Sequence, residues 1–132
     1  MVVDVLVLED EPLIALELKS SLEECSPCSV STFARGDQAQ KWLDEHTPAL
    51  AIADVTLSDG DCEAVVQTLN DRGVAVFVHT GHEPRLNGLE PSFRGKPTYV
   101  KPVDTLGLVE DTVRLIKDIA ALVPGHHCQP QS

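Results

Sequence analysis

The sequence predicts an α/β domain whose open parallel sheet is covered by helices on both faces. Short apolar runs rich in β-branched residues alternate with longer amphipathic stretches along the chain. The runs are apolar at almost every position, which is typical of strands buried on both faces of a parallel sheet. Strands that alternate with helices imply right-handed crossover connections. A length of 132 residues suits one such domain.

Five runs are predicted as strands. Residues 2–8, 50–53 and 74–78 are nearly continuous apolar runs bounded by polar or turn-forming residues. Residues 29–33 alternate between apolar and polar side chains, which favours an edge strand. Residues 98–100 form the shortest run.

The stretches between the strands have helical spacing. Pro12 suits the first turn of a helix, Asp61 can cap a helix and Gly73 can end one. Asp104 or Thr105 can cap the last helix. The apolar residues with this spacing are Ile14, Leu18 and Leu22 in the first helix, Ala39, Trp42 and Leu43 in the second, Val65, Val66 and Leu69 in the third, and Val109, Val113, Ile116, Ala120 and Val123 in the last.

The last helix closes the predicted domain. The domain is expected to span residues 1–123, and residues 124–132 are expected to form a disordered tail. A second apolar face of this helix is either part of a wide core stripe or a surface for a partner or a homodimer. The residues of that face are Leu108, Leu115, Ile119 and Leu122.

Composition and charge exclude several classes of protein. A hydrophobic fraction of 42% rules out global disorder. No apolar run approaches the ~20 residues of a membrane span, and no basic region precedes the first apolar run as in a signal peptide. The net charge of −11 disfavours nucleic acid and anionic membranes as partners, and it suits cations such as Mg²⁺.

The four cysteines are interpreted as reduced thiols of a cytoplasmic protein. Cys25 and Cys28 have C-x-x-C spacing, but they follow a predicted helix, whereas a redox-active pair needs a helix N-terminus. A zinc site would need further ligands from His126, His127 and Cys128. A loop with small apolar thiols is the favoured interpretation.

Polar residues follow four of the predicted strands. Glu9 and Asp10 follow the first strand, Asp54 the third, Thr80 the fourth and Lys101 the fifth. The carboxyl ends of parallel strands lie along one edge of the sheet, where ligands bind. Three carboxylates at this edge would repel one another unless a cation joined them, and Mg²⁺ with oxygen ligands meets that need. Lys101 and Thr80 are donors suited to a phosphoryl oxygen, so this edge has the groups needed for in-line phosphoryl transfer to Asp54.

The motifs at these strand ends are Leu8-Glu9-Asp10-Glu11-Pro12, Ala53-Asp54, His79-Thr80-Gly81 and Lys101-Pro102. In order and spacing they resemble the receiver domain of two-component response regulators, over residues 2 to about 123. The resemblance implies a stand-alone receiver with a flavodoxin-like, doubly wound, five-stranded parallel sheet in the order 2-1-3-4-5, as in the chemotaxis response regulator.

By this resemblance Asp54 is the phosphoryl acceptor, Thr80 is the switch hydroxyl and Lys101 is the phosphoryl-binding cation. The donor would be a phosphohistidine on a sensor histidine kinase or on a histidine phosphotransfer protein. The domain would signal by protein contact or pass the phosphoryl group on in a phosphorelay. It would not be an enzyme, because its chemistry would be limited to its own phosphorylation and dephosphorylation. The Lys101-Pro102 peptide bond is expected to be cis.

The resemblance also implies the metal ligands. Mg²⁺ would be held directly by Asp10, by Asp54 and by the backbone carbonyl of Thr56, and through a water molecule by Glu9. Asp is commoner than Glu at the position of Glu9, and the additional methylene is not expected to abolish metal binding.

Two departures from the family pattern concern signalling. Thr98 stands at a position that is usually aromatic, and Tyr99 lies one residue later. Residues 82–98 should contain the fourth helix, yet they hold five helix breakers, so that helix is expected to be degenerate. We therefore expect phosphorylation to order residues 81–97. The breakers are Pro84, Gly88, Pro91, Gly95 and Pro97.

Two alternative functions stay open. The chain could be a small Mg²⁺-dependent phosphohydrolase with Asp54 as its nucleophile, although Thr56 stands where such enzymes generally carry a second carboxylate. It could also be a receiver-like binding module that is never phosphorylated.

Overall fold

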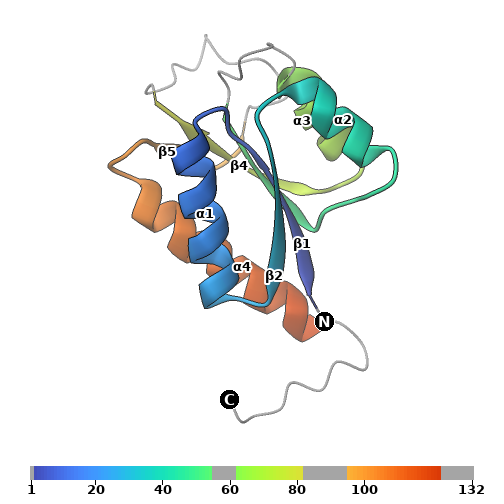
Figure 1. Cartoon of the computed structure of the whole chain (residues 1–132). Helices are drawn as coiled ribbons and strands as arrows, with labels where there is room; N and C mark the ends of the chain where they lie inside the picture. Colours follow the sequence, from blue (N-terminus) through green and yellow to red (C-terminus); the bar gives the residue numbers. More distant parts are fainter. Residues whose placement is uncertain (1, 55–61, 82–94, 123–132) are drawn as a thin grey trace.

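The computed structural model describes residues 2–54, 62–81 and 95–122 (Figure 1). Strands and helices alternate along the chain, as the sequence predicts. The elements are β1 (Val3–Leu8), α1 (Pro12–Cys25), β2 (Cys28–Phe33), α2 (Gly36–Leu43), β3 (Leu50–Ala53), α3 (Cys62–Asp71), β4 (Ala75–Thr80), β5 (Thr98–Val100) and α4 (Thr105–Leu122).

The strands form one parallel sheet in the order β2-β1-β3-β4-β5. This confirms the predicted flavodoxin-like order and the edge position of β2. The chain winds outward from β1 to β2, then returns to the other side of β1 at β3. The strand order therefore reverses between β1 and β3, which is the point where ligands bind in folds of this type.

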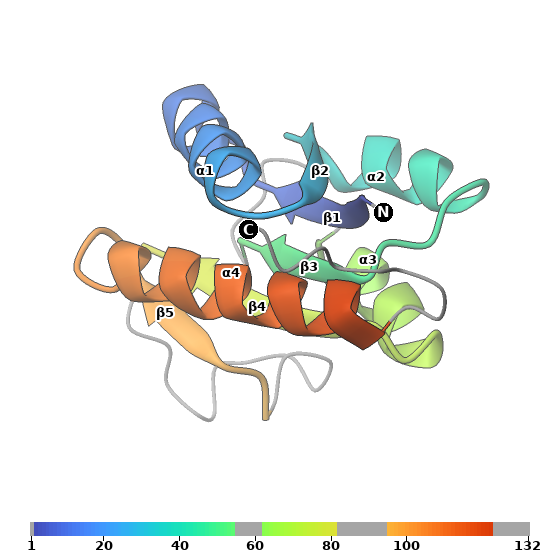
Figure 2. The same cartoon turned by 90° about the horizontal axis from the view of Figure 1, so that it is seen from below.

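Helices cover the sheet on both faces (Figures 1 and 2). Helices α1 and α4 bury one apolar cluster with β1, in which Leu18, Leu22, Leu108 and Ile116 are at most 1% exposed. Helices α2 and α3 bury a second cluster against the opposite face. Because both faces are covered, the central strands are apolar on both sides, which explains their continuous apolar runs.

The fourth strand includes two residues beyond its apolar run. The sequence pattern ends at residue 78, whereas β4 continues through His79 and Thr80. These two residues pair with Tyr99 and Val100 of β5 in register. Ladder hydrogen bonds to β5 therefore extend the strand past the point where its apolar character stops.

Helix α4 is rotated about its axis, so that the residues facing the core differ in part from the predicted apolar stripe. The buried positions are Leu108, Thr112, Ile116 and Ala120, whereas Val109 and Val113 are only half-buried. Thr112 was missed because hydropathy favours valine over threonine at a core position. Leu115 and Ile119 are half-buried and pack on the same core cluster, which favours the wide core stripe over a dimer surface. Leu122 is 80% exposed.

The open edge of the sheet carries an ion pair from α1. Lys19 Nζ lies 2.9 Å from Glu23 Oε2 and donates a hydrogen bond of 2.9 Å to the carbonyl oxygen of Val30. Glu23 Oε2 also accepts a hydrogen bond of 2.9 Å from the Val30 N–H. Both backbone groups of this β2 residue are thus bonded to side chains of α1.

The C-x-x-C pair joins α1 to β2. Cys25 is the exposed last residue of the helix and Cys28 the first of the strand, and both thiols are free. Burial raises the pKa of the Cys28 thiol, which makes it less reactive. The predicted loop with apolar thiols is consistent with these positions.

Several predictions concern residues outside those that the structure describes. They are the cap at Asp61, the carbonyl of Thr56, the helix breakers from Pro84 to Pro91 and the tail 124–132. Among the described helices, none has the length and apolar content needed to cross a bilayer.

Candidate functional site

Backbone hydrogen bonds fix the residues that follow the strands. The N–H of Asp54 donates to the carbonyl oxygen of Leu8 at 3.0 Å, just beyond the β1–β3 ladder. The N–H of Lys101 donates to the carbonyl oxygen of Thr80 at 2.7 Å, just beyond the β4–β5 ladder. The peptide bond between Lys101 and Pro102 is cis, as expected. The sheet thus brings the predicted residues to one edge, and these hydrogen bonds fix Asp54 relative to β1 and Lys101 relative to β4.

Lys101 bridges two buried carboxylates. Its Nζ lies 2.8 Å from Glu9 Oε1 and 2.8 Å from Asp54 Oδ2. The side chain of Lys101 is 15% exposed, and those of Glu9 and Asp54 are 1% and 2% exposed. At this depth an unpaired charge is costly, so the three groups depend on one another.

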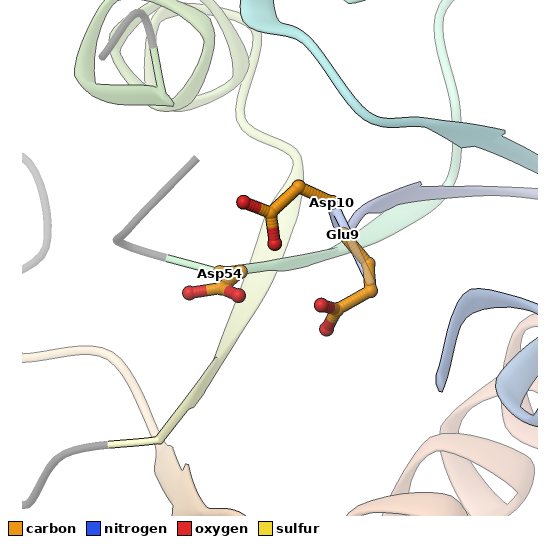
Figure 3. Close-up of side chains that lie close together, drawn as sticks. All are labelled: Glu9, Asp10 and Asp54. Atoms are coloured by element: carbon orange, nitrogen blue, oxygen red, sulfur yellow. The ribbon is translucent and has the colours of Figure 1, made fainter. Parts of the chain in front are cut away.

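Asp10 completes a group of three carboxylates. Glu9, Asp10 and Asp54 each offer an oxygen, and these oxygens lie within 4.8 Å of one another (Figure 3). One ammonium group among three carboxylates leaves the site negatively charged. A close set of carboxylate oxygens fits a hard divalent cation such as Mg²⁺ better than a transition metal that prefers nitrogen or sulfur. The residues present therefore fit the predicted metal.

Glu9 lies at the N-terminus of α1. Its Oε2 accepts a hydrogen bond of 3.1 Å from the N–H of Glu11, so this carboxylate also stabilises the start of the helix. Burial raises the pKa of Glu9 above its usual range, although Lys101 and the Glu11 N–H act in the opposite direction. Burial alone would lower the pKa of Lys101, but hydrogen bonds and charges from Asp54 and Glu9 outweigh it and raise that pKa.

Thr80 and its neighbour His79 are both buried, with exposed fractions of 0% and 1%. His79 Nε2 lies 2.9 Å from Thr105 Oγ1, at the start of α4. Burial and the nearby charge of Lys101 lower the pKa of His79 to about 4, so its ring is neutral at neutral pH. The sequence did not indicate that Thr105 contacts His79, because the two residues lie 26 positions apart in the chain.

Thr98, at the usually aromatic position, and the next residue, Tyr99, differ in their contacts. Thr98 is half-buried, and its hydroxyl donates to the carbonyl oxygen of Lys96 at 3.2 Å. Tyr99 packs on Phe77, with ring centroids 5.8 Å apart, and its hydroxyl donates to Asp111 Oδ2 at 2.7 Å. Burial and this hydrogen bond raise the pKa of Tyr99 to about 12. The aromatic residue of β5 therefore contacts α4.

An apolar groove lies between α1 and α4. One part has a volume of about 290 Å³ and is lined by Ile14, Leu106 and Val109, among others. Leu13 and Val103 lie exposed near the first turn of α1 and before α4, at 71% and 84%. Exposed apolar side chains beside an apolar groove are candidates for contact with a partner.

Known proteins with the same fold have been solved from several organisms. A two-component response regulator from Clostridium difficile superposes with a TM-score of 0.73 at 21% identity, covering 88% of this chain and 96% of that one. The receiver domain of the Francisella response regulator 1452 gives 0.71 at 19% identity, covering 89% and 98%. A CheY-like receiver domain from Methylobacillus flagellatus gives 0.68 at 20% identity, covering 88% and 99%.

The sequence itself identifies the family. No curated protein gives a significant match to the chain. Residues 5–93, however, match the sequence profile described as the response regulator receiver domain. That match spans more than half of the chain and contains the predicted acceptor and metal residues Glu9, Asp10 and Asp54. The chain therefore belongs to the response regulator receiver domain family.

Proposed function

We propose that this protein accepts a phosphoryl group on Asp54 from a phosphohistidine donor, with Mg²⁺ bound. The observation that carries this proposal is the position of Lys101 Nζ, 2.8 Å from both Asp54 and Glu9 at the edge where the strands end. The ammonium group is a donor for a phosphoryl oxygen on Asp54. The family of the chain supports the proposal, since it is a signalling module.

The proposed reaction needs one nucleophile and several donors. A carboxylate oxygen of Asp54 attacks the phosphorus atom, the new P–O bond forms, and the P–N bond to the donor histidine breaks. The imidazole nitrogen takes the electron pair of the broken bond. Lys101 and the hydroxyl of Thr80 donate hydrogen bonds to the phosphoryl oxygens and stabilise their charge.

The metal site of the proposal uses the same carboxylates. Asp10, Asp54 and the backbone carbonyl of Thr56 would hold Mg²⁺ directly, and Glu9 would hold it through water. When bound, the ion neutralises negative charge between Asp54 and the phosphoryl group. Both oxygens of Glu9 already have partners, since Oε1 lies 2.8 Å from Lys101 Nζ and Oε2 accepts from the Glu11 N–H, so a water-mediated role suits this side chain.

The first test is phosphorylation by a small-molecule phosphodonor. Acid-labile phosphate should accumulate on the protein in the presence of Mg²⁺ and should not form when Mg²⁺ is chelated with EDTA. Binding of beryllofluoride, which mimics an aspartyl phosphate, should require Mg²⁺ in the same way. A protein that binds neither group would be a receiver-like binding module. Turnover of a phosphatase substrate would favour the phosphohydrolase, against which the family of the chain argues.

The proposed donor is a sensor histidine kinase or a histidine phosphotransfer protein. It would dock through apolar side chains beside the site, and the candidates in the sequence next to the site residues are Leu13, Ile14, Pro102 and Val103. In the structure Ile14 is half-buried against the core, so its truncation would also lower stability. Leu13 is the better probe, because it is 71% exposed.

We expect Leu13→Ala to slow transfer from a protein donor by about tenfold, since the truncated side chain loses contact area worth roughly 1–2 kcal/mol. Phosphorylation by a small phosphodonor should be unchanged. Leu122→Ala is the matched control, because Leu122 is also largely exposed but lies at the far end of α4. Equal slowing with both donors would place the effect in the acceptor site instead of the docking surface.

The extent of the domain belongs to the same proposal. The receiver would span residues 1–123, followed by the tail 124–132, and its output would be a protein contact or onward transfer of the phosphoryl group. The net charge of −11 argues against nucleic acid as the target.

A further inference from the structure

His79 is a buried polar side chain that the proposed chemistry does not use. It directly precedes Thr80 in β4, so the two side chains point to opposite faces of the sheet. Tyr99, which pairs with His79 in register, packs against the cluster beneath α1 and α4. A shift of the backbone at the β4 end that brings Thr80 toward a phosphoryl group would also move the His79 ring.

The ring has one partner among the described residues. Its Nε2 lies 2.9 Å from Thr105 Oγ1, and its Nδ1 has no hydrogen-bond partner in the described part of the chain. A buried lone pair without a partner costs less than a buried N–H without one. The neutral ring is therefore protonated at Nε2, which donates to Thr105. This single bond joins the strand end to the first residue of α4.

Two further contacts hold the first turns of α4 to β5. The N–H of Val100 donates to Asp104 Oδ2 at 2.9 Å, and the N–H of Asp104 donates to the carbonyl oxygen of Val100 at 2.7 Å. Farther along the helix, Asp111 accepts the hydrogen bond from Tyr99. The strands that carry Thr80 and Lys101 are thus both bonded to the amino-terminal half of α4.

We propose that the hydrogen bond from His79 to Thr105 couples the Asp54 site to helix α4, so that the first turns of α4 respond to phosphorylation. This inference rests on the proposed function, because it needs a phosphoryl group at Asp54. The coupling reaches Leu106 and Val109, which line the groove against α1. It gives the chain a signalling route through α4 that does not require an aromatic residue at position 98, where this sequence has Thr98.

The test compares amide hydrogen exchange with and without beryllofluoride and Mg²⁺. In the unmodified protein we expect ligand binding to change exchange across residues 105–112 by about fivefold, the scale of one hydrogen bond. Thr105→Val removes the hydroxyl at nearly constant volume and should reduce this response below about twofold. Thr105→Ser should restore it. Fluorine NMR of the bound beryllofluoride reports occupancy of the site in every variant.

Thr112→Val is the matched control. Thr112 is buried in the same helix, and its Oγ1 has no hydrogen-bond partner among the described residues. Its substitution removes the same group without breaking a bond, so the exchange response should stay at the unmodified level. Loss of the response in Thr112→Val as well would mean that any change in the helix core abolishes it, which contradicts a specific role of His79.

The outcomes separate this inference from the proposed function. Absence of bound beryllofluoride in the unmodified protein would overturn the proposed function itself. Bound beryllofluoride with an undiminished response in Thr105→Val would overturn only the coupling. If Thr105→Val fails to fold, the NMR signals of the His79 ring nitrogens in the unmodified protein test the coupling instead. They should shift on beryllofluoride binding, and unchanged signals would overturn the coupling without any variant.

Discussion

Asp54→Asn should reduce the incorporation of acid-labile phosphate by at least about 10³-fold with either a small phosphodonor or a protein donor. The carboxamide is a poor nucleophile and a poor metal ligand, and it occupies the same space. The measurement is phosphate bound to the protein after a fixed time with the donor and Mg²⁺. In the proposed function, Asp54 is the side chain whose loss removes the bond-forming atom.

The control for this variant is Asp44→Asn. Asp44 is an exposed residue directly after α2 and is not part of the carboxylate group. Its substitution changes the net charge by the same amount and should leave phosphorylation unchanged. Undiminished acid-labile phosphate in Asp54→Asn would place the acceptor on another residue and overturn the assignment of the site.

Lys101→Met should lower the free energy of unfolding by about 3 kcal/mol at pH 7 without Mg²⁺. The ammonium group bonds two carboxylates that are 1% and 2% exposed, and methionine leaves Glu9 and Asp54 buried without it. Added Mg²⁺ should restore part of the loss, since a bound cation replaces the missing charge. Urea unfolding with and without the metal measures both effects.

The pH dependence of the same variant has a defined sign. Burial already raises the pKa of Glu9 in the folded protein, and removal of Lys101 raises it further. A carboxyl group with a raised pKa binds its proton more tightly in the folded state, so stability increases as the pH falls toward the unfolded value of 4.5. The deficit of Lys101→Met relative to the unmodified protein should therefore shrink between pH 7 and pH 5.

A matched control removes an ammonium group that is solvent-exposed. Lys41→Met lies on α2 and should change the unfolding free energy by less than about 0.5 kcal/mol, with no response to Mg²⁺. If Lys101→Met were as stable as this control at pH 7, the ammonium group would not be compensating the two carboxylates.

The parallel sheet and the convergence of Glu9, Asp54 and Lys101 could be predicted because both follow from local patterns, whereas the order of the strands was implied by the family resemblance. A buried strand can be recognised by its apolar run. A polar residue just after the run lies at the edge formed by the carboxyl ends of the strands in a parallel sheet. The motif order then supplied the family. No knowledge of side-chain packing was needed for these steps.

Contacts between distant segments could not be predicted in this way. The bond between His79 and Thr105 depends on how α4 docks on the sheet, and that docking is set by side-chain shape. The same packing buries Thr112 and leaves Val109 and Val113 half-buried, against their hydropathy. The extension of β4 through Thr80 depends on its ladder with β5, which the sequence of β4 alone does not contain.

The bonds between α1 and Val30 bear on how the protein behaves when it is concentrated. An edge strand with free backbone groups is a template for pairing with a second chain and for aggregation. Here Lys19 and Glu23 occupy the outward groups of Val30, so sheet extension at this position would first have to break them. Association is also favoured near the isoelectric point, about pH 4.6 for this sequence. Because its hydrogen bond from Lys19 lowers the pKa of Glu23, that carboxylate keeps its charge where other carboxyl groups are losing theirs. The contacts at Val30 thus persist best under the conditions in which mutual repulsion between molecules is weakest.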